Sequence, residues 1–557
     1  MPYPSRSTGR LPALSRRSLL GLTAAAAVGT LAACGNGGEG SSFGGNATLD
    51  VPSNVPFEEV AGTIVSEVDG VPIGLTELPQ PRPSATSGVP GSGAPFTTFQ
   101  INWGTPPRSF GDNEYWQEFN ERLGVDYRPD LVAPDAYETR LATLLSGGSV
   151  PDMSHLLTDS PNVQQAIVDG AFAELSEVLG GDRIHDYPNL AAVPEHQWRA
   201  SAVNNGIYGI PTDLSYVNSL HVYRRDWADE LGFTEQPADA EEFYELMTGM
   251  STLGSGRHGF GGLTGGVRGF IDSMFRVPNG WREDGGALES ALETDEFEQS
   301  LAFLRRLWEG GAFHPDALTL SEQGAQDRAL FDEGTTGWQV ASADNWYFAG
   351  TLDTMRARHQ GAEPELLLPM GHDGGDYAFP ASAGYFGIVA ISAEAAKDED
   401  RLHEILSVMD YLRAPIWSEE GFFLRYGLEG VHFQYDDAGY PVSVPDSSAP
   451  ADRDALFYTG LVPGALYFPN ADDVRSAISY TEEVTRHIVT NPAVGLYVPS
   501  AASMQATLDD IVDDYVNGIV SGRRPMSDLE KFRSDWRDRG GDTIRTELQD
   551  ALAEREG

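Results

Sequence analysis

The sequence predicts an α/β protein with two lobes, each built from a sheet flanked by helices. Its 557 residues are too many for one hydrophobic core. Between residues 96 and 154, strand and helix patterns alternate, which is typical of a parallel sheet. Residues 206–227 then hold two short strand patterns around a polar and aromatic stretch, residues 212–218. We interpret that stretch as a crossing between the lobes that faces a cleft.

The first 33 residues have the features of an export signal. Residues 15–20 carry paired arginines, as twin-arginine signals do, but Leu19 stands where Phe is common, so general secretion remains an alternative. The apolar run that follows is shorter than the roughly 20 residues that span a bilayer. It ends at Cys34, the only cysteine, in a pattern that resembles the lipobox of bacterial lipoproteins. We expect a mature N-terminus at Cys34, diacylated through palmitate-like chains; the alternative is a plain membrane anchor.

Residues 34–95 are rich in Gly, Ser, Pro and acidic residues. Such a composition buries little apolar surface, and it predicts a flexible linker. A short strand pattern at residues 63–65 is the one exception.

Two helices alternate with three strands in the first lobe. Apolar spacing predicts helices at residues 112–123 and 137–145, between strands that begin near residues 96, 125 and 151. Ligands of open α/β sheets lie beyond the carboxyl ends of the strands. We therefore expect Trp103 and Asp152 at that edge.

After the crossing, a strand pattern at residues 219–223 leads into a predicted helix that starts at residue 225. Further helices are expected at 239–250 and 295–310, with strands near 338–340 and 366–369. Residues 381–391 form a strand pattern that returns the chain to the first lobe, and a helix is predicted at 401–412.

The order of these elements resembles that of bacterial extracellular solute-binding proteins (family 1), the receptor lipoproteins of ABC importers. The motif Ser-Gly-Gly-x-x-Pro-Asp-Met at residues 146–153, the segment 427–433 and the ending 508–542 are similar to the sugar-binding branch called LipO-like. The resemblance covers residues 96–550. It implies a type II periplasmic-binding-protein fold with three crossings, near residues 213, 376 and 415. Lobe 1 would comprise 96–213 and 376–415, and lobe 2 would comprise 214–375 and 416–550.

The resemblance implies a carbohydrate ligand, and sugars require flat aromatic surfaces with donors and acceptors beside them. Eight residues of these kinds fall in turns or at strand ends, and each of them could instead be a packing residue. They are Trp103, Asp152, Asp213, Tyr216, Trp281, Asn345, Trp346 and Tyr385.

Many relatives bind calcium in a loop rich in Asp and Asn. The corresponding residues here, 251–259, contain no carboxylate. Calcium requires about six to eight oxygen ligands, with acidic donors among them. We expect neither a metal nor another cofactor.

A net charge of −46 argues against nucleic acid as a partner and against binding flat on an anionic membrane. The predicted partners are an oligosaccharide and the transmembrane subunits of an ABC permease. The protein is expected to be a monomer, anchored by lipid at the extracellular face of the cell membrane. No nucleophile elbow, zinc-protease motif or phosphate loop is present, so we predict no enzymatic activity. Two alternatives stay open: a surface lectin or adhesin not coupled to transport, and a glycoside hydrolase with two carboxylates about 5–10 Å apart.

Overall fold

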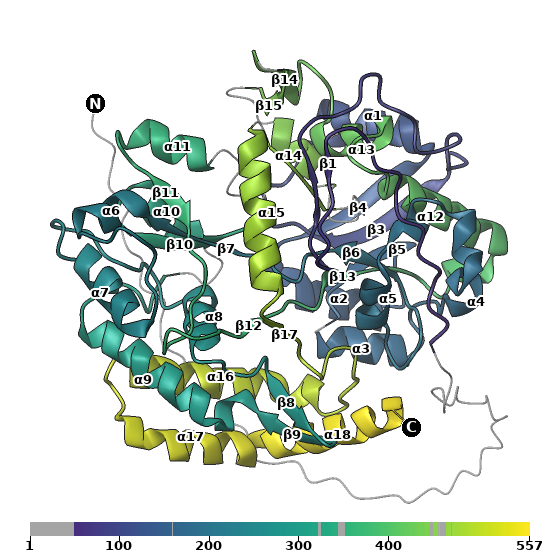
Figure 1. Ribbon diagram of the computed structural model, residues 1–557. Helices are drawn as coiled ribbons and strands as arrows, with labels where there is room; N and C mark the ends of the chain where they lie inside the picture. The colour runs from purple at the N-terminus through teal and green to yellow at the C-terminus, as the bar shows by residue number, and fades with distance from the viewer. Residues whose placement is uncertain are drawn as a thin grey trace, which may run out of the picture. The chain divides into compact units, whose positions relative to one another are not determined.

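The computed structural model (Figure 1) describes residues 49–158, 160–320, 325–342, 351–437, 439–444, 449–454, 456, 464–468 and 470–556. The predicted signal peptide, Cys34, Asn345 and Trp346 lie outside the described residues. None of the described helices is long and apolar enough to cross a membrane.

The helices are α1 (Glu114–Leu123), α2 (Tyr137–Ser146), α3 (Pro161–Val168), α4 (Ser176–Leu179), α5 (Glu195–Ser201), α6 (Arg225–Glu230), α7 (Ala240–Met250), α8 (Gly265–Met274), α9 (Asp295–Glu309), α10 (Ala325–Asp332), α11 (Thr351–Arg358), α12 (Glu399–Leu412), α13 (Glu419–Tyr426), α14 (Ala449–Asp454), α15 (Ala471–Thr485), α16 (Ala501–Val520), α17 (Leu529–Trp536) and α18 (Asp542–Glu556). The strands are β1 (Thr63–Ile64), β2 (Ile73–Leu75), β3 (Pro95–Ile101), β4 (Asp126–Val132), β5 (Met153–Leu156), β6 (Ile210–Asp213), β7 (Leu220–Arg224), β8 (Trp281–Asp284), β9 (Ala287–Ser290), β10 (Trp338–Ala341), β11 (Pro364–Leu366), β12 (Phe379–Pro380), β13 (Tyr385–Ile391), β14 (Phe433–Tyr435), β15 (Pro441–Ser443), β16 (Ala465–Tyr467) and β17 (Ile488–Val489).

The larger sheet has five strands in the order β4-β3-β5-β13-β6. β3 runs parallel to β4 and β5, and β13 is antiparallel to both β5 and β6. The predicted parallel sheet is therefore correct for the first three strands, and the predicted return strand joins it in the opposite direction.

Successive side chains of β3 point to opposite faces of this sheet, and each face packs on its own hydrophobic core. Phe96 packs with residues of α1 and α12, whereas Phe99 and Ile101 pack with residues of α2 and α3. Both predicted helices form. At the start of α1, the Asn113 side chain accepts a hydrogen bond from the Trp116 amide, and Gly124 ends the helix in a left-handed conformation.

The smaller sheet has the order β10-β7-β11, with β7 antiparallel to both neighbours. One of its faces packs on the core that contains α7, α8 and α9, where Phe243, Phe270 and Trp338 are buried. The other face packs on α15, through Leu220 and Val222 of β7.

Within the described residues, three passages connect the two sheets. Residues 214–219 join β6 to β7, and β12 leads into β13 after pairing with β17. The predicted crossing near residue 415 is wrong. Instead of leaving the larger sheet there, the chain continues into α13, where the Phe423 ring stacks on Tyr115 of α1 at 5.0 Å. The chain reaches the smaller sheet later, through α15.

The prediction of a flexible linker over residues 34–95 is wrong for its described part, residues 49–95, which we call the N-terminal strap. β2 of the strap pairs with β1 and with β16. Leu75 is fully buried in a cluster with Trp417 and Phe422, and the Phe57 ring meets Trp417 at 5.6 Å. A few apolar side chains, spaced along a polar segment, are enough to fix the strap because the rest of the protein supplies their partners.

Candidate functional site

Four strands of the larger sheet place side chains at the same end of the sheet, the end where β3, β5 and β6 finish. Trp103 follows β3, Thr158 follows the parallel strand β5, and Asp213 ends β6. Tyr385 begins the antiparallel strand β13, so it reaches the same edge, and its register partner is Asp213. With Tyr216 from the following crossing, these residues form what we call the strand-end rim: Trp103, Thr158, Asp213, Tyr216 and Tyr385.

Trp103 presents an exposed indole on this rim. It follows Asn102, whose side-chain oxygen accepts a hydrogen bond from the Gly104 amide at 3.0 Å and so fixes a tight turn. The Trp103 residue is 46% exposed, although an indole is among the side chains most favoured for burial. An exposed ring on a fixed turn is suited to stacking against the apolar face of a ligand.

Hydroxyl groups stand next to each other where β5 ends and β13 begins. The Tyr385 hydroxyl and the Thr158 Oγ1 are 2.6 Å apart. The Thr158 carbonyl accepts a hydrogen bond from the Gln164 side chain at 3.0 Å, which ties this corner to α3. The corner is thus an ordered pair of groups that can each donate or accept.

Asp213 is half-buried and held on both oxygens. Gln197 of α5 donates a hydrogen bond to Oδ1, and the Gly464 amide donates to Oδ2 at 2.5 Å. The carboxylate is therefore fixed as an acceptor at the end of β6.

Tyr216 is packed rather than free. Its ring meets the His196 ring at 4.9 Å, and Gly70 of the strap and Gly384 both lie against its edges. Burial raises the pKa of Tyr216, and the Asp69 carboxylate raises it further. The sequence analysis did not single out His196, Thr158 or Asp69, because no local pattern shows that these side chains meet the rim.

The expectation that Asp152 lies at the carboxyl edge is wrong. It precedes β5, at the opposite end of the sheet, where Thr97 donates to its Oδ2 through both its amide (2.8 Å) and its hydroxyl (2.7 Å). Arg401 of α12 forms an ion pair with the same oxygen at 3.2 Å. The residue lines a separate cavity of about 740 Å³ with Arg401 and His403. Asp152 directly precedes β5, so it lies at the amino end of that strand, whereas the rim lies at the carboxyl end.

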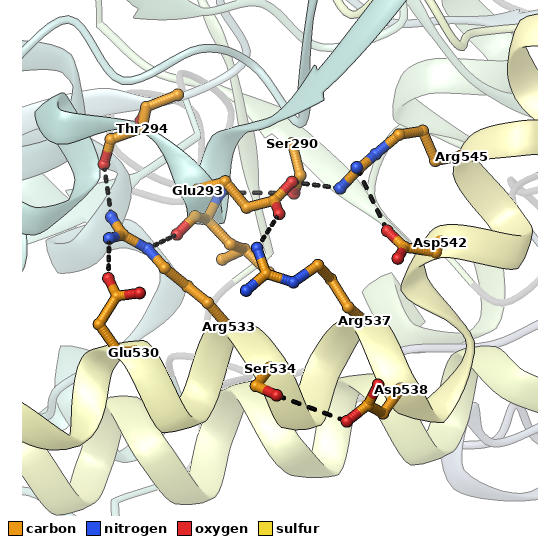
Figure 2. A network of polar contacts seen from close by, with 11 residues as sticks. Ser290, Glu293, Thr294, Glu530, Arg533, Ser534, Arg537, Asp538, Asp542 and Arg545 are labelled. Atoms are coloured by element: carbon orange, nitrogen blue, oxygen red, sulfur yellow. Dashed lines mark hydrogen bonds and ion pairs between the residues drawn. The ribbon is translucent and has the colours of Figure 1, made fainter.

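The expectation that a turn holds out the Trp281 indole is also wrong. The indole packs on the core, with the Trp536 ring at 6.0 Å and the Arg545 guanidinium at 5.9 Å. Figure 2 shows the polar network beside it, in which Arg537 and Arg545 both bind Glu293. Trp281 therefore belongs to the contact between the β8–β9 hairpin and the C-terminal helices.

Within the described ranges, no group of three or more His, Cys, Asp and Glu side chains is arranged to hold a metal ion.

Comparison with known proteins identifies two relatives from Bacillus subtilis (strain 168), although no protein-family model matches the chain. The polygalacturonan/rhamnogalacturonan-binding protein YtcQ is 25% identical over 492 residues, which cover 84% of this chain and 94% of YtcQ. Lipoprotein LipO is 21% identical over 455 residues, covering 76% of this chain and 86% of LipO.

Solved structures share the fold at low sequence identity. An extracellular solute-binding protein from Bifidobacterium longum subsp. infantis has a TM-score of 0.61 at 14% identity and covers 85% of this chain and 100% of its own. The alginate-binding protein AlgQ2 without calcium has a TM-score of 0.59 at 14% identity, with coverages of 84% and 99%. FusA of S. pneumoniae, solved with kestose, has a TM-score of 0.57 at 15% identity, with coverages of 83% and 99%.

These matches confirm the resemblance to extracellular solute-binding proteins of ABC transporters, and the fold is the type II fold of that class. The chain is a homologue of YtcQ and LipO.

Proposed function

We propose that the protein is the substrate-binding lipoprotein of an ABC importer. It is held by lipid on Cys34 at the extracellular face of the cell membrane, captures an oligosaccharide and delivers it to the permease subunits. The ligand binds the closed state of the two lobes more tightly than the open state, and it therefore shifts the equilibrium toward the closed state.

The observation that best supports this proposal is the strand-end rim. Sugar rings have apolar C–H faces and hydroxyl edges, so they need an aromatic surface with donors and acceptors in reach. Trp103 offers the exposed ring, while Thr158, Tyr385 and Asp213 offer fixed hydrogen-bonding groups at the same edge. Tyr216 supports the rim through packing.

The predicted ligand residues Asn345 and Trp346 lie outside the described residues. They remain candidates for the site.

YtcQ and the solved neighbours are named as binding or solute-binding proteins, and we propose that the sugar here is also bound without chemical change. The test is a thermal-shift and calorimetric screen of oligosaccharides on the purified protein, with chromatography of the sugars afterwards. Binding with intact sugars supports a receptor, and shortened sugars would identify a hydrolase.

Transport and anchoring need separate tests. Deletion of the gene should abolish uptake of the bound sugar, whereas normal uptake would favour a lectin or adhesin. A Cys34→Ser protein should leave the membrane fraction, and its retention would contradict the lipid anchor.

A further inference from the structure

The N-terminal strap reaches the strand-end rim at residues 66–71. The Ser215 hydroxyl donates a hydrogen bond to the Gly70 carbonyl at 3.3 Å. Gly70 has a φ of +80°, and a Cβ added there would lie 2.3 Å from Cδ2 of Tyr216. Only glycine combines this conformation with so close an approach, so the strap is fitted to the Tyr216 ring.

The same loop is fastened on its other side to α15. Ser66 donates a hydrogen bond to the Glu482 carboxylate at 2.6 Å, and the Val68 amide donates to the Ser66 hydroxyl at 2.9 Å. Between these two attachments lies Asp69, whose side chain is exposed. The backbone at Asp69 is therefore held beside the rim, and its exposed carboxylate is open to solvent and ligand.

The charge of Asp69 acts on the rings of the rim. Burial lowers the pKa of His196, and the carboxylates of Asp69 and Asp213 oppose that change. Asp69 also adds to the effect of burial in raising the pKa of Tyr216. Both carboxylates thus add negative charge to the surroundings of the His196 ring, and Asp69 adds it to those of the Tyr216 ring as well.

We propose that Asp69 is a specificity-determining residue of the ligand site, which with Asp213 selects neutral oligosaccharides over those that contain uronic acids. This inference rests on the proposed carbohydrate-binding function. It sets the protein apart from YtcQ, whose name states an acidic polymer as ligand. A uronate carboxylate near the His196–Tyr216 pair would be repelled by both aspartates, whereas a sugar hydroxyl can donate a hydrogen bond to either.

The test is calorimetric binding to the full-length protein in detergent. Malto-, xylo- and manno-oligosaccharides are compared with galacturono- and mannurono-oligosaccharides of equal length, at about 20 mM and about 500 mM salt. The variants are Asp69→Asn, Asp69→Glu, which keeps the charge, and Glu67→Gln. Glu67 is the matched control, because it is an exposed acid of the same loop.

Wild type and Asp69→Glu should bind neutral sugars more tightly than uronate sugars. Asp69→Asn should narrow the ratio of the two affinities about two- to five-fold at low salt and much less at high salt, because an exposed charge is screened. Glu67→Gln should leave the ratio unchanged.

Three results would overturn the role of Asp69 and leave the proposed function intact. They are a wild-type preference for uronate sugars, an unchanged ratio in Asp69→Asn, and equal narrowing by Asp69→Asn and Glu67→Gln. If neither class of sugar binds, the proposed function fails, and the role of Asp69 fails with it.

Discussion

The hydroxyl of Tyr385, the first residue of β13, lies 2.6 Å from Oγ1 of Thr158, which follows β5. The two strands are antiparallel neighbours, with Ile388 opposite Leu156. The contact therefore joins the end of one strand to the beginning of the next at the edge where a ligand of this fold would lie.

Replacing Tyr385 by Phe removes this hydroxyl and keeps the ring. A hydrogen bond of this kind contributes about 1 kcal/mol, so we expect oligosaccharide affinity to fall about five-fold. The measurement is calorimetric titration with the sugar found in the screen. Tyr435→Phe is the control, since Tyr435 is 38% exposed on β14 and lies off the rim. Equal losses in both variants would contradict a specific role for Tyr385.

Replacing Trp103 by Ala removes the exposed ring of the rim. Loss of an aromatic platform costs about 1–2 kcal/mol, so the dissociation constant should rise about five- to thirty-fold, while the melting temperature changes little because the side chain is exposed. Phe110→Ala is the matched control, because Phe110 is 47% exposed but meets the Trp116 ring edge-to-face, away from the strand ends. If Trp103→Ala binds the sugar with unchanged affinity, the Trp103 indole is not part of the binding site.

Replacing Leu75 by Ala tests whether the N-terminal strap is part of the folded protein. Leu75 is fully buried against Trp417 and Phe422, so truncation should lower the free energy of unfolding by about 2–5 kcal/mol. Denaturant unfolding measures the change. Val65→Ala is the control within the strap, since Val65 is 56% exposed and its truncation should stay within about 0.5 kcal/mol. A flexible linker would tolerate both changes equally.

His221 makes stability depend on pH. Its ring lies between Phe270 and Trp338, and both ring nitrogens are buried with no hydrogen-bond partner among the described residues. Burial lowers its pKa to about 3. The folded state therefore keeps His221 neutral, while the unfolded chain takes up a proton below about pH 6.5, so stability falls as the pH drops from there toward 3.

At pH 5.5, His221 should lower the free energy of unfolding by about 1.4 kcal/mol relative to neutral pH. Burial raises the pKa of Asp272 and of Asp410 to about 6, which acts in the opposite direction. The comparison is therefore between wild type and His221→Leu, measured by denaturant unfolding at pH 7.5 and 5.5. Wild type should lose about 1.4 kcal/mol more than the variant, and His185→Asn, at an exposed position, should behave as wild type. Parallel losses in wild type and His221→Leu would contradict the prediction.

Local patterns in the sequence predicted much of the fold. Alternation at β3, apolar spacing in α1 and α2, and the turn residues between them identified the larger sheet, and the order of elements identified the class of protein. The positions of Trp103, Asp213 and Tyr385 at strand ends, and of Tyr216 in the crossing, were predicted in the same way, since a strand end is visible in the chain itself.

The sequence by itself determined the elements, their order and the class, because these depend on neighbours along the chain. Only the tertiary structure decided that Asp152 faces away from the rim, that Trp281 packs on the C-terminal helices, and that α13 stays with the larger sheet. It also decided that the strap is ordered and brings Asp69 and Gly70 to Tyr216. The physical reason is the same in each case: burial and hydrogen bonding join segments more than 50 residues apart, and no local pattern encodes which distant partner satisfies a side chain.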